Sequence, residues 1–335
     1  MTHSARISLA DATDLIGSAM MAAGVNASAA MSVANALVAA EAEGQVGHGF
    51  SRLGDYVAQV RSGKINRAAA VQTSAPLPAS VLVDADCGFA YPALDVARDA
   101  AIPIAQSLGI AIVGITNSHH CGALSVQVDR LARAGLIGIM VANAPKAIAP
   151  WGAREPFYGT NPIAFAAPRI DQPPLVIDLS LSTVARGKVM NAFKTGQDIP
   201  EGWALDADGA PTTSAKAALE GTMVPIGGAK GTALALMVEI LSATFTGAAT
   251  SNQATSFFAA EGAPPRVGQT LIAIKPRSGS DFADRLETLL SEILAMEGAR
   301  LPGTRRIAAL ETAQAEGLLV PDHYLAAARK LADGQ

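Results

Sequence analysis

The sequence predicts an α/β fold, in which helices flank a β-sheet. Between residues 80 and 142, three runs of apolar, often β-branched residues alternate with two segments of helical periodicity. This rhythm is typical of α/β proteins. The chain has 335 residues, of which 50% are hydrophobic, and this is enough for a large buried core. The rhythm by itself predicts a parallel, doubly wound sheet, and a helical first quarter precedes it.

Helices are expected through most of the first quarter. Ser8 with Asp11 three residues later is typical of a helix start, because a serine hydroxyl accepts a backbone hydrogen bond there and an acid favours the positive end of the helix. This helix is expected to run to about Ala23. A second is expected over residues 26–44 and a third over 53–60.

The remaining elements follow from apolar runs and helical spacing between breaks rich in glycine and proline. Strands are expected at residues 80–84, 110–115, 136–142, 162–168, 175–178 and 269–274. Helices are expected at residues 91–107, 125–134, 180–191, 232–242, 282–296 and 318–332. A loop is expected over residues 143–161, and a loop of this length in a compact domain is usually functional.

Composition excludes several classes of partner. The 25 basic and 29 acidic residues give a net charge of −4, and without long basic runs nucleic acid is not an expected partner. The N-terminus does not have the pattern of a secretion signal, and no apolar stretch reaches membrane-spanning length. The two cysteines, Cys87 and Cys121, are too few for a disulfide framework. We therefore expect a cytoplasmic protein without a membrane partner.

Several common motifs are missing. No Gly-x-Gly-x-x-Gly follows a strand, no Walker-type phosphate loop occurs, and no Gly-x-Ser-x-Gly marks a hydrolase. His119 and His120 are adjacent at the end of an expected strand, where neighbouring side chains leave on opposite faces. Such a pair rarely chelates one ion, so no metal is expected. One histidine is expected to face a cleft and the other to pack away from it.

The segment from Gly47 to Arg52 has two interpretations. His48 lies between glycines, and Arg52 follows four residues later. An imidazole exchanges protons near neutral pH, and a guanidinium binds a carboxylate through two parallel hydrogen bonds. The pair could therefore hold and protonate a small anion. The alternative is a glycine-capped helix end with a solvated arginine and an incidental histidine.

Other candidates also have two interpretations each. Asp178 ends an apolar strand, where it either caps a following helix or orients a histidine. Ser180 and Ser182 follow, and hydroxyls and amides at a helix start can hold a phosphate. Lys230 lies in a glycine-rich loop and either is solvated or contacts a phosphate. The Arg305-Arg306 pair faces either a 2′-phosphate or water.

Taken together, these motifs resemble those of a known family. In order they are Gly47-His48-Gly49-x-x-Arg52, Asn117-Ser118-His119-His120-x-Gly122, Gly159-Thr160-Asn161-Pro162-Ile163-Ala164, Ile177-Asp178-Leu179-Ser180-x-Ser182, Gly228-Ala229-Lys230-Gly231 and Pro302-Gly303. Over nearly its whole length the chain resembles the malate/L-lactate dehydrogenase family typified by the type-2 enzymes, which is unrelated to the Rossmann-type malate and lactate dehydrogenases. Asn-Ser-His-His, the 159–164 block and Ile199–Gly202 look closest to the Δ1-piperideine-2-carboxylate/Δ1-pyrroline-2-carboxylate reductases.

The resemblance implies a non-Rossmann NAD(P)-binding α/β fold with a mixed or mostly antiparallel sheet, flanking helices and a helical N-terminal region. It also implies a tight homodimer whose active site borrows from the partner subunit. Residues 1–75 are expected to form a helical substrate and dimer region that carries His48 and Arg52. Residues 76–310 would form the NAD(P)-binding core, and residues 311–335 a C-terminal helical segment that packs on the N-terminal region.

The resemblance further implies a set of site residues. His48 matches the family's proton donor, and His120 and Asp178 are expected to act in catalysis with it. The expected substrate-binding residues are Arg52, which would bind the carboxylate, Asn117 and Thr160. The expected cofactor-binding residues are Val176, Ile177, Asp178, Leu179, Ser180, Leu181, Ser182, Ala229, Lys230, Gly303, Thr304 and Arg305.

The implied activity is NADPH-dependent reduction of a cyclic imine carboxylate, from Δ1-pyrroline-2-carboxylate to L-proline or from Δ1-piperideine-2-carboxylate to L-pipecolate. NADPH is expected because the Arg305-Arg306 pair suits a 2′-phosphate, with NADH as the alternative. Two other hypotheses are reduction of a 2-keto acid to a 2-hydroxy acid and a non-catalytic metabolite- or nucleotide-binding protein. Gly47 stands where many family members have serine, which disfavours an ordinary hydroxy acid, and Cys121 stands where an aromatic residue is common.

Overall fold

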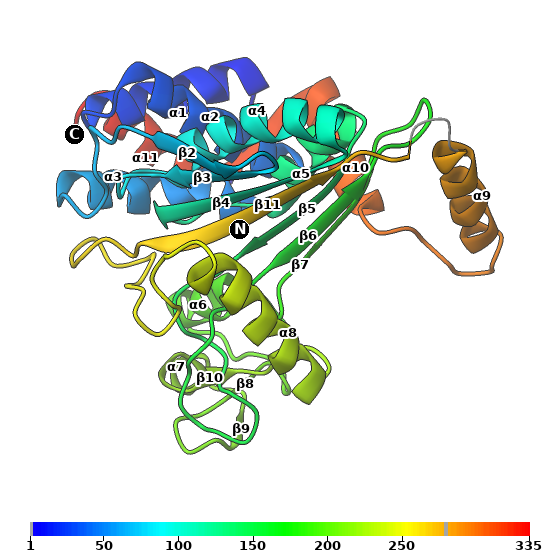
Figure 1. The fold of residues 1–335 in the computed structure, drawn as a ribbon. Helices are drawn as coiled ribbons and strands as arrows, with labels where there is room; N and C mark the ends of the chain where they lie inside the picture. Colours follow the sequence, from blue (N-terminus) through cyan, green and yellow to red (C-terminus); the bar gives the residue numbers. More distant parts are fainter. Residues whose placement is uncertain (1–2, 278–280) are drawn as a thin grey trace.

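The computed structural model describes residues 3–277 and 281–335. At its centre is a seven-stranded sheet with the order β2-β3-β4-β11-β5-β6-β7 (Figure 1). Its strands are β2 (Gln72–Leu77), β3 (Ser80–Asp84), β4 (Ile110–Ser118), β11 (Val267–Ile274), β5 (Ile137–Ala142), β6 (Ile163–Ala167) and β7 (Leu175–Leu179). Of the neighbouring pairs described in this sheet, β3 and β4 are parallel and the others are antiparallel.

This topology confirms the mixed, mostly antiparallel sheet, and the parallel sheet predicted from the strand–helix rhythm is wrong. The rhythm misleads because β11, from late in the chain, lies between β4 and β5 and runs antiparallel to both. Strands β5, β6 and β7 are then antiparallel neighbours in sequence order. Antiparallel neighbours need no crossover helix, whereas every parallel pair does.

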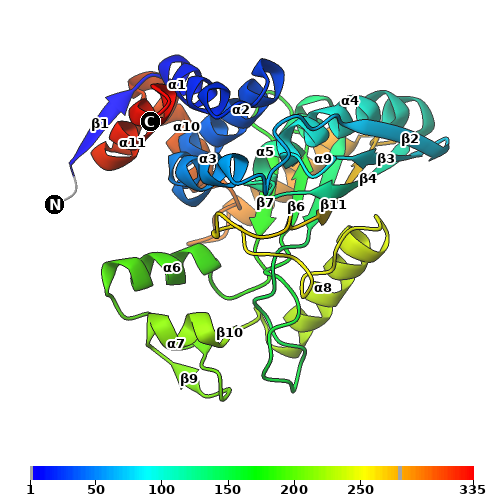
Figure 2. The same cartoon turned by 90° about the vertical axis from the view of Figure 1, so that its left-hand side faces the viewer.

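Helices cover both faces of the sheet. Figures 1 and 2 show α1, α2 and α4 on one side of the sheet and α8 on the other, with α6 and α7 beyond it. The α-helices are α1 (Leu9–Ala22), α2 (Ala27–Ala42), α3 (Leu53–Arg61), α4 (Ala90–Leu108), α5 (Leu124–Arg133), α6 (Arg186–Thr195), α7 (Ala215–Glu220), α8 (Ala229–Glu239), α9 (Phe282–Leu294), α10 (Thr304–Glu316) and α11 (Asp322–Ala332). Helix α4 packs on β3, β4 and β11, and α5 packs on β5, β6 and β7. The largest buried core lies between these helices and the sheet.

The N-terminal helices begin where the sequence predicts. The Ser8 hydroxyl accepts a hydrogen bond from the Asp11 amide at 3.0 Å, and the Asn26 side chain accepts one from the Ala29 amide at 2.9 Å. Two short 3₁₀ turns, η1 (Val46–His48) and η2 (Phe50–Arg52), join α2 to α3. The segment from Gly47 to Arg52 is therefore a bent connection between two helices.

The C-terminal part differs from the expectation in two places. The helix predicted over 318–332 starts only at Asp322, because Leu318–Pro321 forms β12 and pairs antiparallel with β1 (Ser4–Ile7). Helix α10 forms at residues 304–316, where the sequence suggested only a basic cluster. Helix α11 packs on α1 and α3, and this brings the two ends of the chain together (Figure 2).

The helix predicted over 180–191 is also displaced, since α6 begins at Arg186. Residues 180–185 are not helical, because they pair with a distant loop. Ser182 forms a β-bridge with Pro225, and the Leu181 carbonyl accepts a hydrogen bond from the Ile226 amide. Beyond α6 lies a small sheet of β10 (Thr222–Met223), β8 (Ala204–Leu205) and β9 (Pro211–Thr212). A π-helical turn, η3 (Ile240–Thr244), extends α8. Among the described helices none is both long and apolar enough to cross a membrane.

Candidate active site

Two of the predicted histidines face each other. His48 ends η1, and His120 is the second residue after β4. Their rings stack with centroids 5.3 Å apart and planes 17° from parallel. The other histidine of the pair, His119, is buried and shares a 2.7 Å hydrogen bond with the Gln59 side chain. The structure thus places one histidine beside His48 and packs its neighbour away from it, as expected for adjacent residues.

Both facing imidazoles are neutral at pH 7. Burial lowers the pKa of His48 to about 4, and the positive charge of Arg52 contributes in the same direction. Burial and the same arginine hold the pKa of His120 well below its usual range. The Nδ1 atom of His48 is buried and has no hydrogen-bond partner among the described residues. A neutral imidazole with an unpaired nitrogen is suited to exchange a proton with a bound ligand.

Two tyrosines that the sequence did not suggest complete this cluster. The Tyr56 hydroxyl lies 2.6 Å from His120 Nδ1 and 2.9 Å from the Tyr91 hydroxyl. Burial raises the pKa of both phenols, so they stay protonated and act as hydrogen-bond donors. Tyr56 follows Arg52 by one helical turn. This spacing was the only feature of the sequence that could have placed Tyr56 near the site. The chain of hydroxyls fixes the orientation of the His120 ring.

Arg52 is buried beside the histidines, with only 4% of its surface exposed. One terminal nitrogen lies 3.2 Å from the Asp55 carboxylate, and the other donates to the Phe257 carbonyl at 3.1 Å. The guanidinium lies over the Phe258 ring, 4.6 Å from its centroid. Within the described chain its Nε–H has no partner. A buried guanidinium with unused hydrogen-bonding capacity is suited to bind a carboxylate.

Asp178 does not cap α6. Its carboxylate instead accepts a hydrogen bond from the Ser125 amide at 2.8 Å, in the first turn of α5, where the helix dipole favours a negative charge. Burial nevertheless raises the pKa of Asp178 to about 6, and the nearby Glu43 carboxylate acts in the same direction. The hydroxyl of Ser125 donates to Glu43 at 2.9 Å, and Glu43 pairs with Arg306 at 2.7 Å.

Asn117 and Thr160, the other predicted substrate-binding residues, are held by protein groups. The Asn117 amide nitrogen donates to Asp84 at 2.9 Å, and its oxygen accepts from Arg266 at 2.8 Å. The Thr160 carbonyl accepts a hydrogen bond from the Leu181 amide at 2.8 Å. None of these three contacts involves the histidine pair.

The predicted cofactor-binding segments lie next to one another. The Ile226 amide donates to the Leu181 carbonyl at 2.9 Å, which joins the end of β7 to the loop before α8. A Cβ atom at Gly303 would lie 3.0 Å from the Val176 carbonyl, so this turn lies against β7 as well. The Ser180 and Ser182 hydroxyls are 2.7 Å apart. Three segments from distant parts of the sequence thus meet at the edge of the sheet.

This region fits a dinucleotide. Helices α8 and α10 follow Gly228 and Gly303, which have φ values of 62° and 82°, and neither helix start has a side-chain cap. The amides of the first turns remain available, and a helix N-terminus binds phosphate through such amides. Lys230 and Arg305 are exposed in these two first turns. The residues present therefore suit the phosphates of NAD(P).

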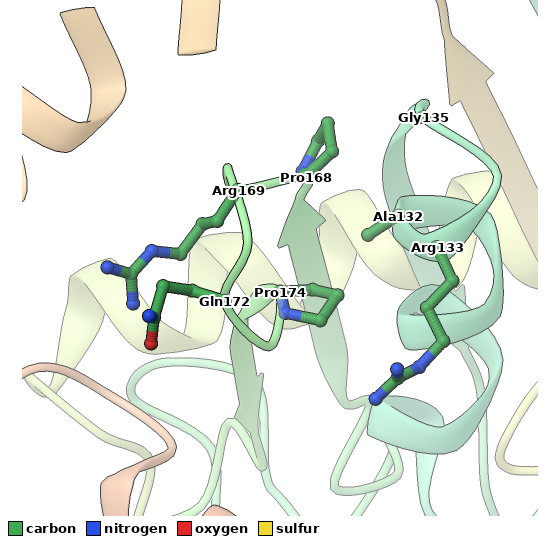
Figure 3. A pocket seen from close by; sticks show the side chains of 7 residues that line it. All are labelled: Ala132, Arg133, Gly135, Pro168, Arg169, Gln172 and Pro174. Atoms are coloured by element: carbon green, nitrogen blue, oxygen red, sulfur yellow. The ribbon is translucent and has the colours of Figure 1, made fainter. Parts of the chain in front are cut away.

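A hollow of about 400 Å³ elsewhere on the molecule holds none of the predicted site residues (Figure 3). It lies between the end of α5 and the connection from β6 to β7. Its two cations are already paired, since Arg169 binds Glu287 at 2.7 Å and Arg133 binds Asp129 at 2.6 Å. This hollow therefore offers no free positive charge for an anionic substrate.

Residues 7–328 match the family described as malate/L-lactate dehydrogenase. The chain belongs to this family. Proteins similar to it are named as dehydrogenases and reductases. The protein is therefore an NAD(P)-dependent oxidoreductase.

Three similar proteins are named for two kinds of substrate, a hydroxy acid and a cyclic imine. The chain is 50% identical to a (2R)-3-sulfolactate dehydrogenase (NADP(+)) from Chromohalobacter salexigens, over 94% of this chain and 95% of that protein. It is 39% identical to a Δ1-pyrroline-2-carboxylate/Δ1-piperideine-2-carboxylate reductase from Pseudomonas putida, over 97% and 96% of the two chains. A crystal structure of Δ1-piperideine-2-carboxylate reductase from Pseudomonas syringae pv. tomato has a TM-score of 0.93 and 36% identity, and the match covers 98% of this chain and 99% of that chain.

Proposed function

We propose that this member of the malate/L-lactate dehydrogenase family interconverts a 2-hydroxy acid and the corresponding 2-oxo acid, with 3-sulfolactate and 3-sulfopyruvate as the preferred pair and NADP(H) as the cofactor. The observation that carries the proposal is the 50% identity to a sulfolactate dehydrogenase over nearly the whole chain. This substrate class was the alternative hypothesis from the sequence. The neutral histidine pair beside Arg52 is consistent with it.

In the oxidative direction the site needs a base and an anion-binding group. Arg52 would bind the C1 carboxylate, and His48 would accept the hydroxyl proton through its unpaired Nδ1. Bound NADP⁺ supplies the hydride acceptor. The negative charges of the substrate would raise the pKa of His48, so the same imidazole can return a proton during reduction. Tyr56 keeps the ring of His120 in place behind it.

Gly47 favours a substrate with a second acid group. A Cβ atom at this position would have no neighbour within 4 Å, so the glycine leaves open space beside His48. A sulfonate on C3 would occupy space that a serine side chain would otherwise restrict. Replacing Gly47 with serine should therefore lower kcat/KM for 3-sulfopyruvate more than for pyruvate, and an NADPH-oxidation assay with both substrates measures this.

Reduction of a cyclic imine carboxylate remains the second candidate, because the reductases are also similar over nearly the full chain. An iminium carries positive charge, and Asp178, with a pKa of about 6, is mostly ionised at neutral pH and could stabilise it. With this substrate the enzyme would act in proline metabolism in the cytoplasm.

The test of the proposed function is an NADPH-oxidation panel of 3-sulfopyruvate, pyruvate, oxaloacetate, Δ1-pyrroline-2-carboxylate and Δ1-piperideine-2-carboxylate. The proposal expects the highest kcat/KM for 3-sulfopyruvate. A higher value for either cyclic imine would favour the second candidate, and no turnover with any member would favour a binding protein.

The preference for NADPH is part of the proposal and is supported by Arg305. Its side chain is exposed in the first turn of α10, close to the segment that meets β7. A guanidinium there would bind a 2′-phosphate. Replacing Arg305 with alanine should weaken NADPH binding and leave NADH binding nearly unchanged, as measured by fluorescence titration of the two cofactors. An equal loss for both would contradict the assignment.

A homodimer is also proposed. Helix α8, the η3 turn and the residue after it expose apolar side chains, each 39–49% accessible: Leu234, Leu236, Met237, Ile240 and Phe245. An apolar helix face of this kind is unusual on a monomer and marks an interaction surface. This face is the support for the expected homodimer.

A further inference from the structure

An irregular segment before β11, residues 254–263, forms one wall of the candidate site. Phe257 is buried, and its ring centroid lies 5.3 Å from that of His119 and 5.2 Å from that of His120. The neighbouring Phe258 ring lies 4.6 Å from the Arg52 guanidinium carbon. The position of this segment therefore determines what surrounds both the histidines and the arginine.

Lys64 holds this segment by an unusual arrangement. Only 2% of the residue is exposed. Its ammonium donates to three backbone carbonyls, those of Ser256 at 2.7 Å, Ala259 at 3.0 Å and Glu261 at 3.3 Å. All three donors of the group are thus used, and no carboxylate of the described chain forms an ion pair with it. Burying an ammonium group costs free energy unless its hydrogen bonds are satisfied, so the cation and the segment stabilise each other.

Helix α3 adds two further contacts to the same segment. The Gln59 amide donates to the Phe257 carbonyl at 2.7 Å, and the Ser62 hydroxyl donates to the Ala260 carbonyl at 2.6 Å. Arg52 shares the Phe257 carbonyl through a 3.1 Å hydrogen bond. The carbonyl that orients Arg52 therefore belongs to the segment that Lys64 holds. A shift of the segment would move both the hydrogen-bond acceptor and the stacked ring of Arg52.

We propose that Lys64 is a positioning residue of the substrate site: it fixes residues 254–263 so that Phe257 and Phe258 hold Arg52 in the orientation that binds the substrate carboxylate. The proposal rests on the proposed role of Arg52 and is independent of whether the substrate is an oxo acid or an imine. It assigns a specific function in substrate binding to a lysine that does not itself touch the substrate.

The experiment compares Lys64→Met with the unaltered enzyme, using whichever panel substrate that enzyme turns over fastest. Because misorientation of a binding group costs up to about 100-fold, we expect a rise in KM of about 10- to 100-fold. The kcat value should change less than about threefold, and the Kd for NADPH should not change. A purely structural role would instead lower the thermal stability, raise the Kd for NADPH and lower kcat together. Lys275→Met is the control. This exposed lysine, directly after β11, also donates to a backbone carbonyl, that of Gln106 near the end of α4 at 2.8 Å. It lies beside the first residue of β4, whereas the histidines follow the last.

Phe258→Ala keeps the proposal testable if the lysine variant does not fold, since Phe258 is 37% exposed. It should raise KM in the same way. In the double variant the effect of Lys64→Met should shrink below about threefold, because contacts in one network are not additive. Additive effects, or a KM within twofold of the unaltered enzyme in Lys64→Met, would overturn the proposal. A failure of Arg52→Met to raise KM would instead show that the proposed carboxylate-binding role of Arg52 is wrong.

Discussion

His48 and Arg52 show how far single residues could be interpreted from the sequence. Their side-chain chemistry and spacing left two interpretations open, and the family resemblance then predicted a proton donor and a carboxylate-binding group. The sequence could not show that burial and the neighbouring guanidinium lower the pKa of His48 to about 4. It also could not supply the hydrogen bonds of Tyr56 to His120 and to Tyr91, because these contacts depend on the tertiary packing.

The role of His48 gives the first prediction at this scale. Replacing it with alanine should lower kcat by about 10²- to 10⁴-fold, the usual contribution of a general acid–base group. The Kd for NADPH should stay the same, because the cofactor-binding segments lie elsewhere. Steady-state kinetics and fluorescence titration check the two parts. A kcat within threefold of the unaltered enzyme would exclude His48 as the proton-transfer group.

Glu41 lies beneath the same segment and gives a pH-dependent prediction. Its carboxylate accepts a hydrogen bond from the Phe50 amide at 2.8 Å, and burial raises its pKa from 4.5 to about 7. Because the folded chain binds the proton more tightly than the unfolded chain, this group's contribution to stability is full below pH 4.5 and is lost as the pH rises through about 7. In Glu41→Gln the melting temperature should fall less between pH 5 and pH 8 than in the unaltered protein. An equal fall in both would contradict the assignment.

At the scale of elements, local patterns predicted the helices and strands whose ends carry their own signals, such as the caps at Ser8 and Asn26. They failed where a distant segment decides the conformation. Residues 318–321 form a strand because β1 pairs with them. Residues 180–185 are not helical because Pro225 pairs with Ser182, and Asp178 consequently faces α5.

The connection from α2 to α3 provides a prediction at the same scale. A Cβ atom at Gly49 would overlap the Glu41 side chain, whereas one at Gly47 would meet nothing within 4 Å. Gly49→Ala should therefore destabilise the protein by about 1–3 kcal/mol, the usual cost of overpacking. Gly47→Ala is the matched control and should leave the unfolding free energy nearly unchanged. Chemical denaturation of both variants measures the difference, and equal stabilities would show that the Glu41 contact is not restrictive.

At the scale of the whole molecule, the sheet order brings together parts that the sequence separates. The insertion of β11 between β4 and β5 could not be inferred from local patterns, and only the family resemblance indicated a mixed sheet. The division into residues 1–75, 76–310 and 311–335 stays a prediction. The packing of α11 on α1 and α3 supports its last part.

The proposed homodimer is tested at this scale. Met237→Glu places a charge in the exposed apolar face of α8, and a charge buried in an interface costs several kcal/mol. The variant should elute as a monomer in size-exclusion chromatography with light scattering and should lose activity. Leu108→Glu, at an exposed apolar residue at the end of α4 (53% exposed, against 42% for Met237), is the control and should remain a dimer. A dimeric Met237→Glu would place the interface elsewhere.

The central claim concerns the bond that the enzyme reduces. The most direct measurement is a competition in which equal concentrations of 3-sulfopyruvate and Δ1-pyrroline-2-carboxylate are mixed with limiting NADPH, and the products are quantified by NMR. The account predicts that 3-sulfolactate forms in at least tenfold excess over proline, which corresponds to about 1.4 kcal/mol of preference for the oxo acid in the transition state. A mixture dominated by L-proline would contradict it.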